Sequence, residues 1–75
     1  MIIRAEWPGY VVDVLVSVGQ EVDEDENLIL MEGTDSAHTP FYIAAPDGGK
    51  VRKILVEEGD FADEDDELLE MGDSE

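Results

Sequence analysis

The sequence predicts an all-β domain built from two similar halves. Apolar runs rich in valine and isoleucine, bracketed by glycine and proline, favour strands. No stretch shows the 3.6-residue apolar period of an amphipathic helix. Residues 3–31 also match residues 43–71 at a constant offset of forty positions, which is the signature of an internal repeat. We therefore expect a β structure with pseudo-two-fold symmetry, in which each half supplies strands that it could not bury alone.

Six apolar segments mark the expected strands. In chain order they contain residues 2–3, 11–16, 28–31, 41–45, 51–56 and 68–71. The second and fifth are rich in β-branched residues and have a glycine near each end, and the third and sixth follow acidic turns. The fourth is confined between Pro40 and Pro46, which restrict a strand to an edge.

The repeat consists of identical residues at matching positions. The glycine and apolar pairs are Ile3 and Ile43, Ala5 and Ala45, Gly9 and Gly49, Val11 and Val51, Leu15 and Leu55, Val16 and Val56, Gly19 and Gly59, Leu28 and Leu68, and Met31 and Met71. Three acidic pairs at 23–25 and 63–65 count for less, because this composition matches acids by chance. The offset predicts that residues 9–16 and 49–56 are equivalent strands sharing one core. It also isolates residues 32–42 as a connecting hairpin.

Length and charge exclude several classes of function. The 75 residues provide one domain, expected at residues 1–72, followed by an acidic C-terminal tail at residues 73–75. Twenty-one acidic and four basic residues give a net charge of −17, which repels nucleic acid and anionic membranes. Without cysteine there are no disulfides or thiolate metal sites. No apolar run could span a membrane or serve as a signal peptide, so we expect a soluble, cytoplasmic protein.

Residues 2–72 resemble the biotinyl and lipoyl domain family. Residues 7–16 and 18–22 look like the opening of a biotin carrier domain, and Ala45-Pro46 followed by Gly48 looks like the turn that begins its second half. The resemblance implies a flattened β-barrel, or barrel-sandwich hybrid, of two four-stranded antiparallel sheets related by a pseudo-two-fold axis. It also implies that the hairpin between the halves presents a lysine that a ligase modifies with biotin or lipoate.

The hairpin departs from the family at that lysine. Glu32-Gly33-Thr34-Asp35-Ser36-Ala37 resembles the lipoyl motif, a Glu followed by Asp-Lys-Ala, and Ser36 stands where the lysine belongs, flanked by Asp35, Ala37 and His38. A hydroxyl cannot form the amide that holds either cofactor. We therefore expect no cofactor, and lipoate or biotin only if the attachment residue is restored.

The hairpin is also longer than the family pattern. Counting forward from Gly19 places the modified position near Asp35, whereas counting back from Pro46 places it near His38. Neither position is a lysine. Lys50 lies at the start of a predicted strand with Lys53 close behind, where we expect solubilising charges rather than an attachment site.

No catalytic or metal site emerges from the remaining residues. Ser36 and His38 would share a face if that arm is extended, but a nucleophile also needs an orienting group and an oxyanion site, so a solvated histidine is expected. The acidic run at residues 63–67 lacks the glycine of a calcium loop, since Leu68 occupies that place. Four aromatic residues are expected to fill the core rather than form an exposed patch: Trp7, Phe41, Tyr42 and Phe61.

These observations predict a non-catalytic interaction or structural module, not an enzyme, whose partner is a protein within a multienzyme complex. The alternative is a covalent lipoyl or biotin carrier of a 2-oxo acid dehydrogenase or biotin-dependent carboxylase with its attachment residue altered. Unmodified relatives in membrane-fusion adaptors would need a long helical hairpin between the halves. Residues 33–36 are similar to the Asp-Ser motif of acyl carrier proteins, but the prolines and valine runs oppose a helical bundle. Neither nucleic acid nor membrane insertion is expected.

Overall fold

The computed structural model describes residues 1–73, which form eight strands and no helix. The strands are β1 (Ile2–Arg4), β2 (Gly9–Val14), β3 (Glu21–Val22), β4 (Asn27–Gly33), β5 (Pro40–Ala44), β6 (Gly49–Ile54), β7 (Phe61–Ala62) and β8 (Glu67–Gly72). Within this part of the chain there is accordingly no helix that could cross a membrane. Of the acidic tail expected at residues 73–75, Asp73 is exposed, and residues 74–75 lie outside the described residues.

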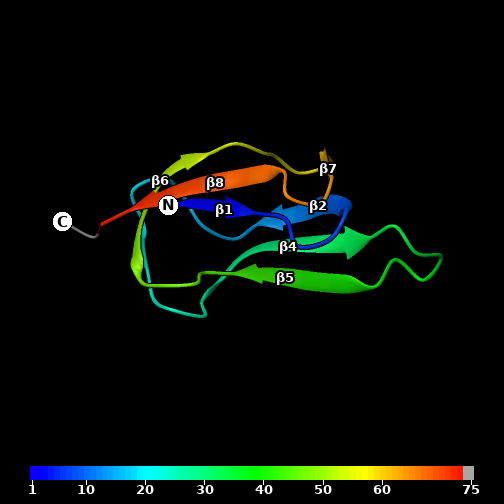
Figure 1. The fold of residues 1–75 in the computed structure, drawn as a ribbon, viewed down its shortest axis with the longest axis horizontal. Helices are drawn as coiled ribbons and strands as arrows, with labels where there is room; N and C mark the ends of the chain where they lie inside the picture. The colour runs from blue at the N-terminus through cyan, green and yellow to red at the C-terminus, as the bar shows by residue number, and fades with distance from the viewer. Residues whose placement is uncertain (74–75) are drawn as a thin grey trace.

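The strands form two four-stranded antiparallel sheets (Figure 1). One has the order β5-β4-β2-β7 and is called the hairpin sheet, because β4 and β5 are joined by the long hairpin; the other, β1-β8-β6-β3, is called the opposite sheet. A shift of forty residues turns each strand of one sheet into a strand of the other, in the same order. The pseudo-two-fold, all-β fold predicted from the repeat is confirmed, and a helical bundle of the acyl carrier type is excluded.

The symmetry extends to strand register and turns. Val11 is in register with Met31 and Val51 with Met71, and a bulge follows Val11 and Val51 alike. Equivalent turns close with equivalent hydrogen bonds: the Gly19 amide donates to the Val51 carbonyl and the Gly59 amide to the Val11 carbonyl, both at 2.8 Å. The two glycines share a φ of 93°, a left-handed conformation that favours glycine.

A single aliphatic core lies between the sheets. Its members come from both halves: Ile3, Ala5, Val11, Val16, Val22, Leu28, Ile29, Met31, Ile43, Ala45, Val51, Ala62, Leu68, Leu69 and Met71. No polar or charged residue of the described chain is buried. The sheets therefore pack face to face as a sandwich, with β1, β3, β5 and β7 at the edges.

The aromatic residues do not fill this core, which corrects the sequence-based expectation. Trp7, Tyr42 and Phe61 are 59%, 54% and 50% exposed, and only Phe41 packs partly against the core. The reason is strand phase, because alternate side chains point to opposite faces of a sheet. Tyr42 precedes buried Ile43, and Phe61 precedes buried Ala62, so both point outward.

The predicted equivalent strands are shorter than expected. Residues 9–16 and 49–56 were expected to be strands, and β2 and β6 end at Val14 and Ile54. One further ladder hydrogen bond follows each strand. The Leu15 amide donates to the Leu28 carbonyl and the Leu55 amide to the Leu68 carbonyl, both at 2.9 Å. The chain then leaves the sheet toward the glycine turns, which leaves Leu15 and Leu55 exposed.

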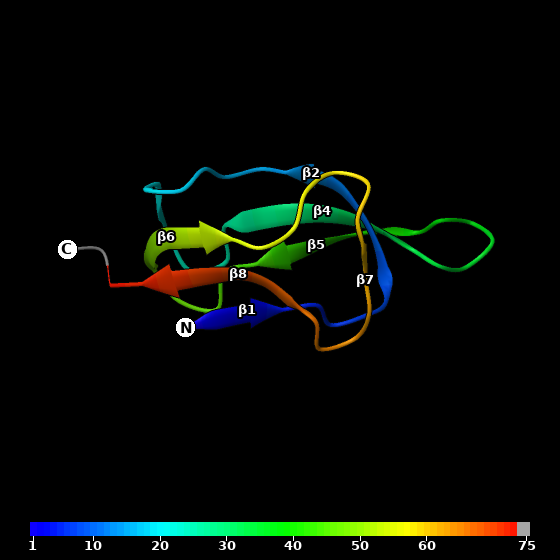
Figure 2. The same ribbon diagram turned by 90° about the horizontal axis from the view of Figure 1, so that it is seen from above.

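The molecule is elongated, with principal extents of 42 × 19 × 18 Å. Figure 2 shows the hairpin between β4 and β5 projecting from one end of the sandwich, while the start of β1 and the end of β8 lie at the other end. The fold thus carries this hairpin as an isolated projection.

Candidate functional site

The hairpin between β4 and β5 is centred on Ser36. The register pairs Leu30 with Tyr42, Met31 with Phe41 and Glu32 with Pro40, and each pair is symmetric about position 36. In the sequence, counting forward from Gly19 led to Asp35 and counting back from Pro46 led to His38, which lie on either side of Ser36. The structure therefore places Ser36 at the midpoint of the hairpin, with its side chain exposed.

Asp35 organises the loop. Its carboxylate accepts hydrogen bonds from the Thr39 amide at 3.0 Å and from the Thr39 hydroxyl at 2.7 Å. Both bonds favour the charged form, so the Thr39 hydroxyl, followed by the Thr39 amide, lowers the pKa of Asp35 below its ordinary value. The Gly33 amide donates to the Thr39 carbonyl at 2.9 Å and closes the loop. Thr39 was not singled out from the sequence, although aspartate is a common turn residue.

Ser36 and Ala37 form the corner of a β-turn. The His38 amide donates to the Asp35 carbonyl at 3.0 Å, and His38 has a φ of 50°. The segment from Ser36 to His38 is therefore a turn and not an extended strand. The two side chains do not share a face, as they would in an extended strand. Among residues 1–73 the Ser36 hydroxyl has no hydrogen-bond partner. The hairpin thus presents Ser36 to solvent and gives it no base.

An open pocket of about 330 Å³ lies at the base of the hairpin. Trp7 and Pro8, from the loop between β1 and β2, form one side, and the hairpin and β5 form the other with Gly33, Thr34, Asp35, Thr39 and Phe41. The pocket is shallow and mainly apolar. This pocket was not predicted from the sequence, because its two sides are far apart along the chain.

The other candidate groups are dispersed. Lys50 and Lys53 lie on β6, in the opposite sheet, where Lys50 is in register with Gly72 near the end of the chain. In the acidic turn at residues 63–67, where no calcium loop was expected, the Asp66 carboxylate accepts a hydrogen bond from the Asp63 amide at 2.8 Å and so caps the turn. Over the described residues no group of three histidine or carboxylate side chains could hold a metal ion.

Comparison with known proteins agrees with this arrangement. The model of the biotinyl/lipoyl family, described as "Biotin-requiring enzyme", matches residues 1–71. The urea carboxylase of Kluyveromyces lactis is similar, with 26% identity and a TM-score of 0.83 over 92% of this chain and 6% of that one. A single-chain, multi-domain long-chain acyl-CoA carboxylase has 28% identity and a TM-score of 0.82, with the same coverage of 92% and 6%.

The chain therefore spans about 6% of the length of each carboxylase. The search of curated proteins gave no match. The family model covers nearly the whole chain, the similar structures share its fold, and the eight strands have the repeat that the family pattern implied. The chain belongs to the biotinyl/lipoyl domain family.

Proposed function

We propose that this domain carries no covalent cofactor and acts as a non-catalytic interaction or structural module. The observation that carries the proposal is Ser36 at the midpoint of the hairpin, where the family resemblance implies a lysine. An amide to biotin or lipoate needs a primary amine, and residues 33–40 offer hydroxyls, one carboxylate and one imidazole. The hairpin residues therefore do not fit an amide-linked group.

The two lysines support the same proposal. Lys50 is half-buried and in register with Glu21, and exposed Lys53 is in register with Glu70. Both lysines lie beside a carboxylate residue within the opposite sheet and not in the projecting hairpin. They are suited to balancing charge and not to carrying a mobile arm.

A role without catalysis also fits the hairpin chemistry. Nucleophilic catalysis needs a base within hydrogen-bond reach of the nucleophile and donors for the developing charge. Ser36 has no hydrogen-bond partner in the described chain, and the Asp35 carboxylate is already bonded to Thr39. The pocket beside them is open and mainly apolar, which favours contact with another molecule over chemistry in a closed site.

The similar structures point to a protein partner. One of them is described as a single-chain, multi-domain carboxylase, and this domain matches only 6% of it. A module this small in so large a protein acts through contacts with other domains. We therefore place the partner of this chain among the components of a multienzyme assembly.

The competing function is a covalent carrier whose attachment residue has been altered, and the carboxylase names of the similar structures favour it. Intact-mass measurement of protein purified from its native source separates the two. We expect the mass of the unmodified chain, and no gain when the purified chain is incubated with a biotin or lipoate ligase, the cofactor and ATP. An added biotinyl or lipoyl mass on any residue of the unaltered chain would overturn the proposal.

A further inference from the structure

The outward face of the hairpin sheet carries a set of apolar side chains that are at least partly exposed. Five side chains point outward from its four strands: Tyr10, Val12, Leu30, Tyr42 and Phe61, here called the aromatic face. Tyr10 and Phe61 are 47% and 50% exposed, and their rings meet edge to face with centroids 5.3 Å apart. Exposed apolar groups of this size are usual singly, but a contiguous set marks an interaction site.

Strand register makes these side chains neighbours. Tyr10 is in register with Phe61 across β2 and β7, and Leu30 with Tyr42 across β4 and β5. Leu30 is also in register with Asp13, which follows Val12 at the bulge of β2. The aromatic face therefore has members on all four strands of the hairpin sheet, and Glu32, in register with Tyr10, and Asp13 lie between its two pairs.

The pseudo-symmetry supplies an internal comparison. A shift of forty residues carries the aromatic face onto the outward face of the opposite sheet, where the equivalent residues are Lys50, Arg52, Glu70, Ile2 and Glu21. Four of these five are charged. The same positions of the same fold therefore accept charged side chains, so the fold itself does not require aromatic ones. Function rather than folding explains their presence on the hairpin sheet.

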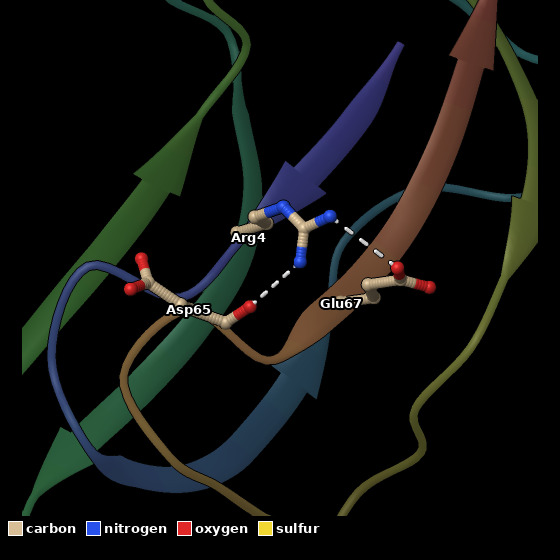
Figure 3. Close-up of polar contacts among 3 residues, drawn as sticks. All are labelled: Arg4, Asp65 and Glu67. Atoms are coloured by element: carbon tan, nitrogen blue, oxygen red, sulfur yellow. Dashed lines mark hydrogen bonds and ion pairs between the residues drawn. The ribbon is translucent and has the colours of Figure 1, made fainter.

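The opposite sheet also carries every basic residue of the chain: Arg4, Lys50, Arg52 and Lys53. Figure 3 shows Arg4 donating to the Asp65 carbonyl at 2.9 Å and to the Glu67 carboxylate at 3.4 Å. Acidic and basic groups thus offset one another on that face. The hairpin sheet contains no lysine or arginine, and Asp13 and Glu32 lie among its apolar side chains.

We propose that the aromatic face is a docking surface for a protein partner that presents apolar side chains together with arginine or lysine. Arginine suits it because guanidinium groups stack on tyrosine and phenylalanine rings and pair with nearby carboxylates. A second copy of this chain is a poor occupant, since a symmetric contact would bring Asp13 and Glu32 against their own copies between bodies of charge −17. The proposal rests on the proposed function, because it names the surface and the partner chemistry of that interaction module.

Peptide probes test the surface directly. The first probe is a ten-residue peptide in which arginine alternates with leucine; one control replaces arginine with glutamate, and another replaces leucine with serine. We expect the arginine–leucine peptide to shift the backbone amide NMR signals of β2, β4, β5 and β7, and both controls to bind at least tenfold more weakly. Equal binding of the arginine–serine peptide would reduce the effect to general charge attraction and overturn the proposal.

A charge-neutral double variant provides the matched test. Tyr10→Lys with Phe61→Glu installs the residues that the opposite sheet has at these positions, and it leaves the net charge unchanged. We expect at least a tenfold loss of peptide affinity. The control, Lys50→Ser with Glu21→Ser on the opposite sheet, also preserves net charge and should change affinity less than twofold. If the double variant does not fold, Tyr42→Ser at the edge strand β5 replaces it, with an expected loss of at least threefold.

Two further outcomes count against the proposal. Sedimentation that shows a wild-type dimer, lost in the double variant, would assign the face to a second copy. Binding of wild-type protein to neutral phosphatidylcholine vesicles, lost in the same variant, would assign it to a lipid surface. None of the substituted residues lies in the hairpin loop, so these results are independent of the mass measurement that tests the proposed function.

Discussion

At the level of single residues, the contact between Asp35 and Thr39 determines how the hairpin tip is ordered. The Thr39 hydroxyl and then the Thr39 amide lower the pKa of Asp35 below its ordinary value of 3.8. Thr39→Val removes the hydroxyl but keeps the amide, so we expect the pKa of Asp35 to rise toward the ordinary value. NMR titration of the Asp35 carboxyl carbon measures the change. Thr34→Val, in the same exposed loop, is the control, and an equal pKa in wild type and Thr39→Val would contradict the assignment.

The same contact predicts how the hairpin responds to acid. Because the pKa of Asp35 is lower in the folded hairpin than in the unfolded chain, the contact stabilises the loop above the ordinary pKa and is lost as pH falls through the lowered one. We expect amide exchange at Thr39 to accelerate, relative to its intrinsic rate, only in that acidic range. The side chain is exposed, so the unfolding temperature should change little. A transition at Thr39 near neutral pH would show that another group controls the loop.

Ser36→Lys tests the alignment of the hairpin with the lipoyl motif. Position 36 is the midpoint of the hairpin and lies between an aspartate and an alanine, as the lysine does in the lipoyl pattern. We expect a lipoate ligase to add one lipoyl group to Ser36→Lys, and biotin ligase to add nothing, because the methionines that flank a biotinylated lysine are absent. Intact mass reads out both reactions. Modification of His38→Lys but not of Ser36→Lys would show that the second count, from Pro46, was the right one.

The sequence predicted the hairpin but not its internal contacts. Asp35, Ser36, Ala37 and His38 lie between β4 and β5, within the connection that the repeat isolated. The role of Thr39 depends on how the loop folds back, which strand patterns do not describe. Likewise, Phe61 was expected in the core because its side chain is large and apolar. It is exposed because it points to the outer face of the two-residue strand β7.

At the level of elements, close approach between β2 and β4 depends on Gly9. A Cβ added at Gly9 would lie closer than 3.0 Å to the Glu32 carbonyl oxygen, which is backbone of the neighbouring strand and cannot turn away. Gly9→Ala must therefore separate β2 from β4, and we expect a loss of about 1–3 kcal/mol in the free energy of unfolding, as for overpacking elsewhere. Urea denaturation measures this loss.

The repeat offers matched comparisons for that substitution. Gly49 is the symmetric equivalent of Gly9, and its added Cβ would meet the Gly72 carbonyl oxygen in the same way, so Gly49→Ala should destabilise to a similar extent. Gly48→Ala is the control, because its Cβ would lie 3.5 Å from the nearest atom, an ordinary contact. If all three variants had the same unfolding midpoint, close strand approach would not explain why Gly9 and Gly49 are glycines.

Long strands were predictable, and short ones were not. β2 and β6 contain six residues each and overlap the apolar segments at residues 11–16 and 51–56, which were long enough to identify from composition. β3 and β7 contain two residues each, too few for any periodicity, and they exist because the glycine turns return the chain to β6 and β2. Their presence could be expected only from the family resemblance.

At the level of the whole molecule, the repeat predicted the core better than hydrophobicity did. Ile3, Val11 and Leu28 are identical to their partners forty residues later, and all of these residues are buried. Tyr10 and Phe61 are equally apolar but have Lys50 and Glu21 as partners, and they are exposed. A position that stays apolar in both halves faces the core, since both halves use the same geometry. The rule has exceptions: Leu15 and Leu55 follow the ends of their strands, and Ile2 and Tyr42 point outward from the edge strands β1 and β5.

The net charge of −17 predicts a salt-dependent stability. The short extents of 19 and 18 Å lie below the Debye length of about 30 Å at ~0.01 M salt and above that of about 8 Å at ~0.15 M. Repulsion therefore acts across the whole body at low salt and is screened at high salt, so sodium chloride should raise the melting temperature. Each 1 kcal/mol recovered corresponds to about 4–8 °C in a domain of this size.

Circular dichroism melts across that range of salt measure the effect. The matched variant is Glu24→Gln with Glu58→Gln, which lowers the net negative charge at two exposed turn positions without changing the core. We expect it to melt at a higher temperature than wild type at low salt and to gain less from added salt, because it has less repulsion to screen. If wild type and variant melted at the same temperature at both salt concentrations, self-repulsion would make no measurable contribution to the stability of this fold.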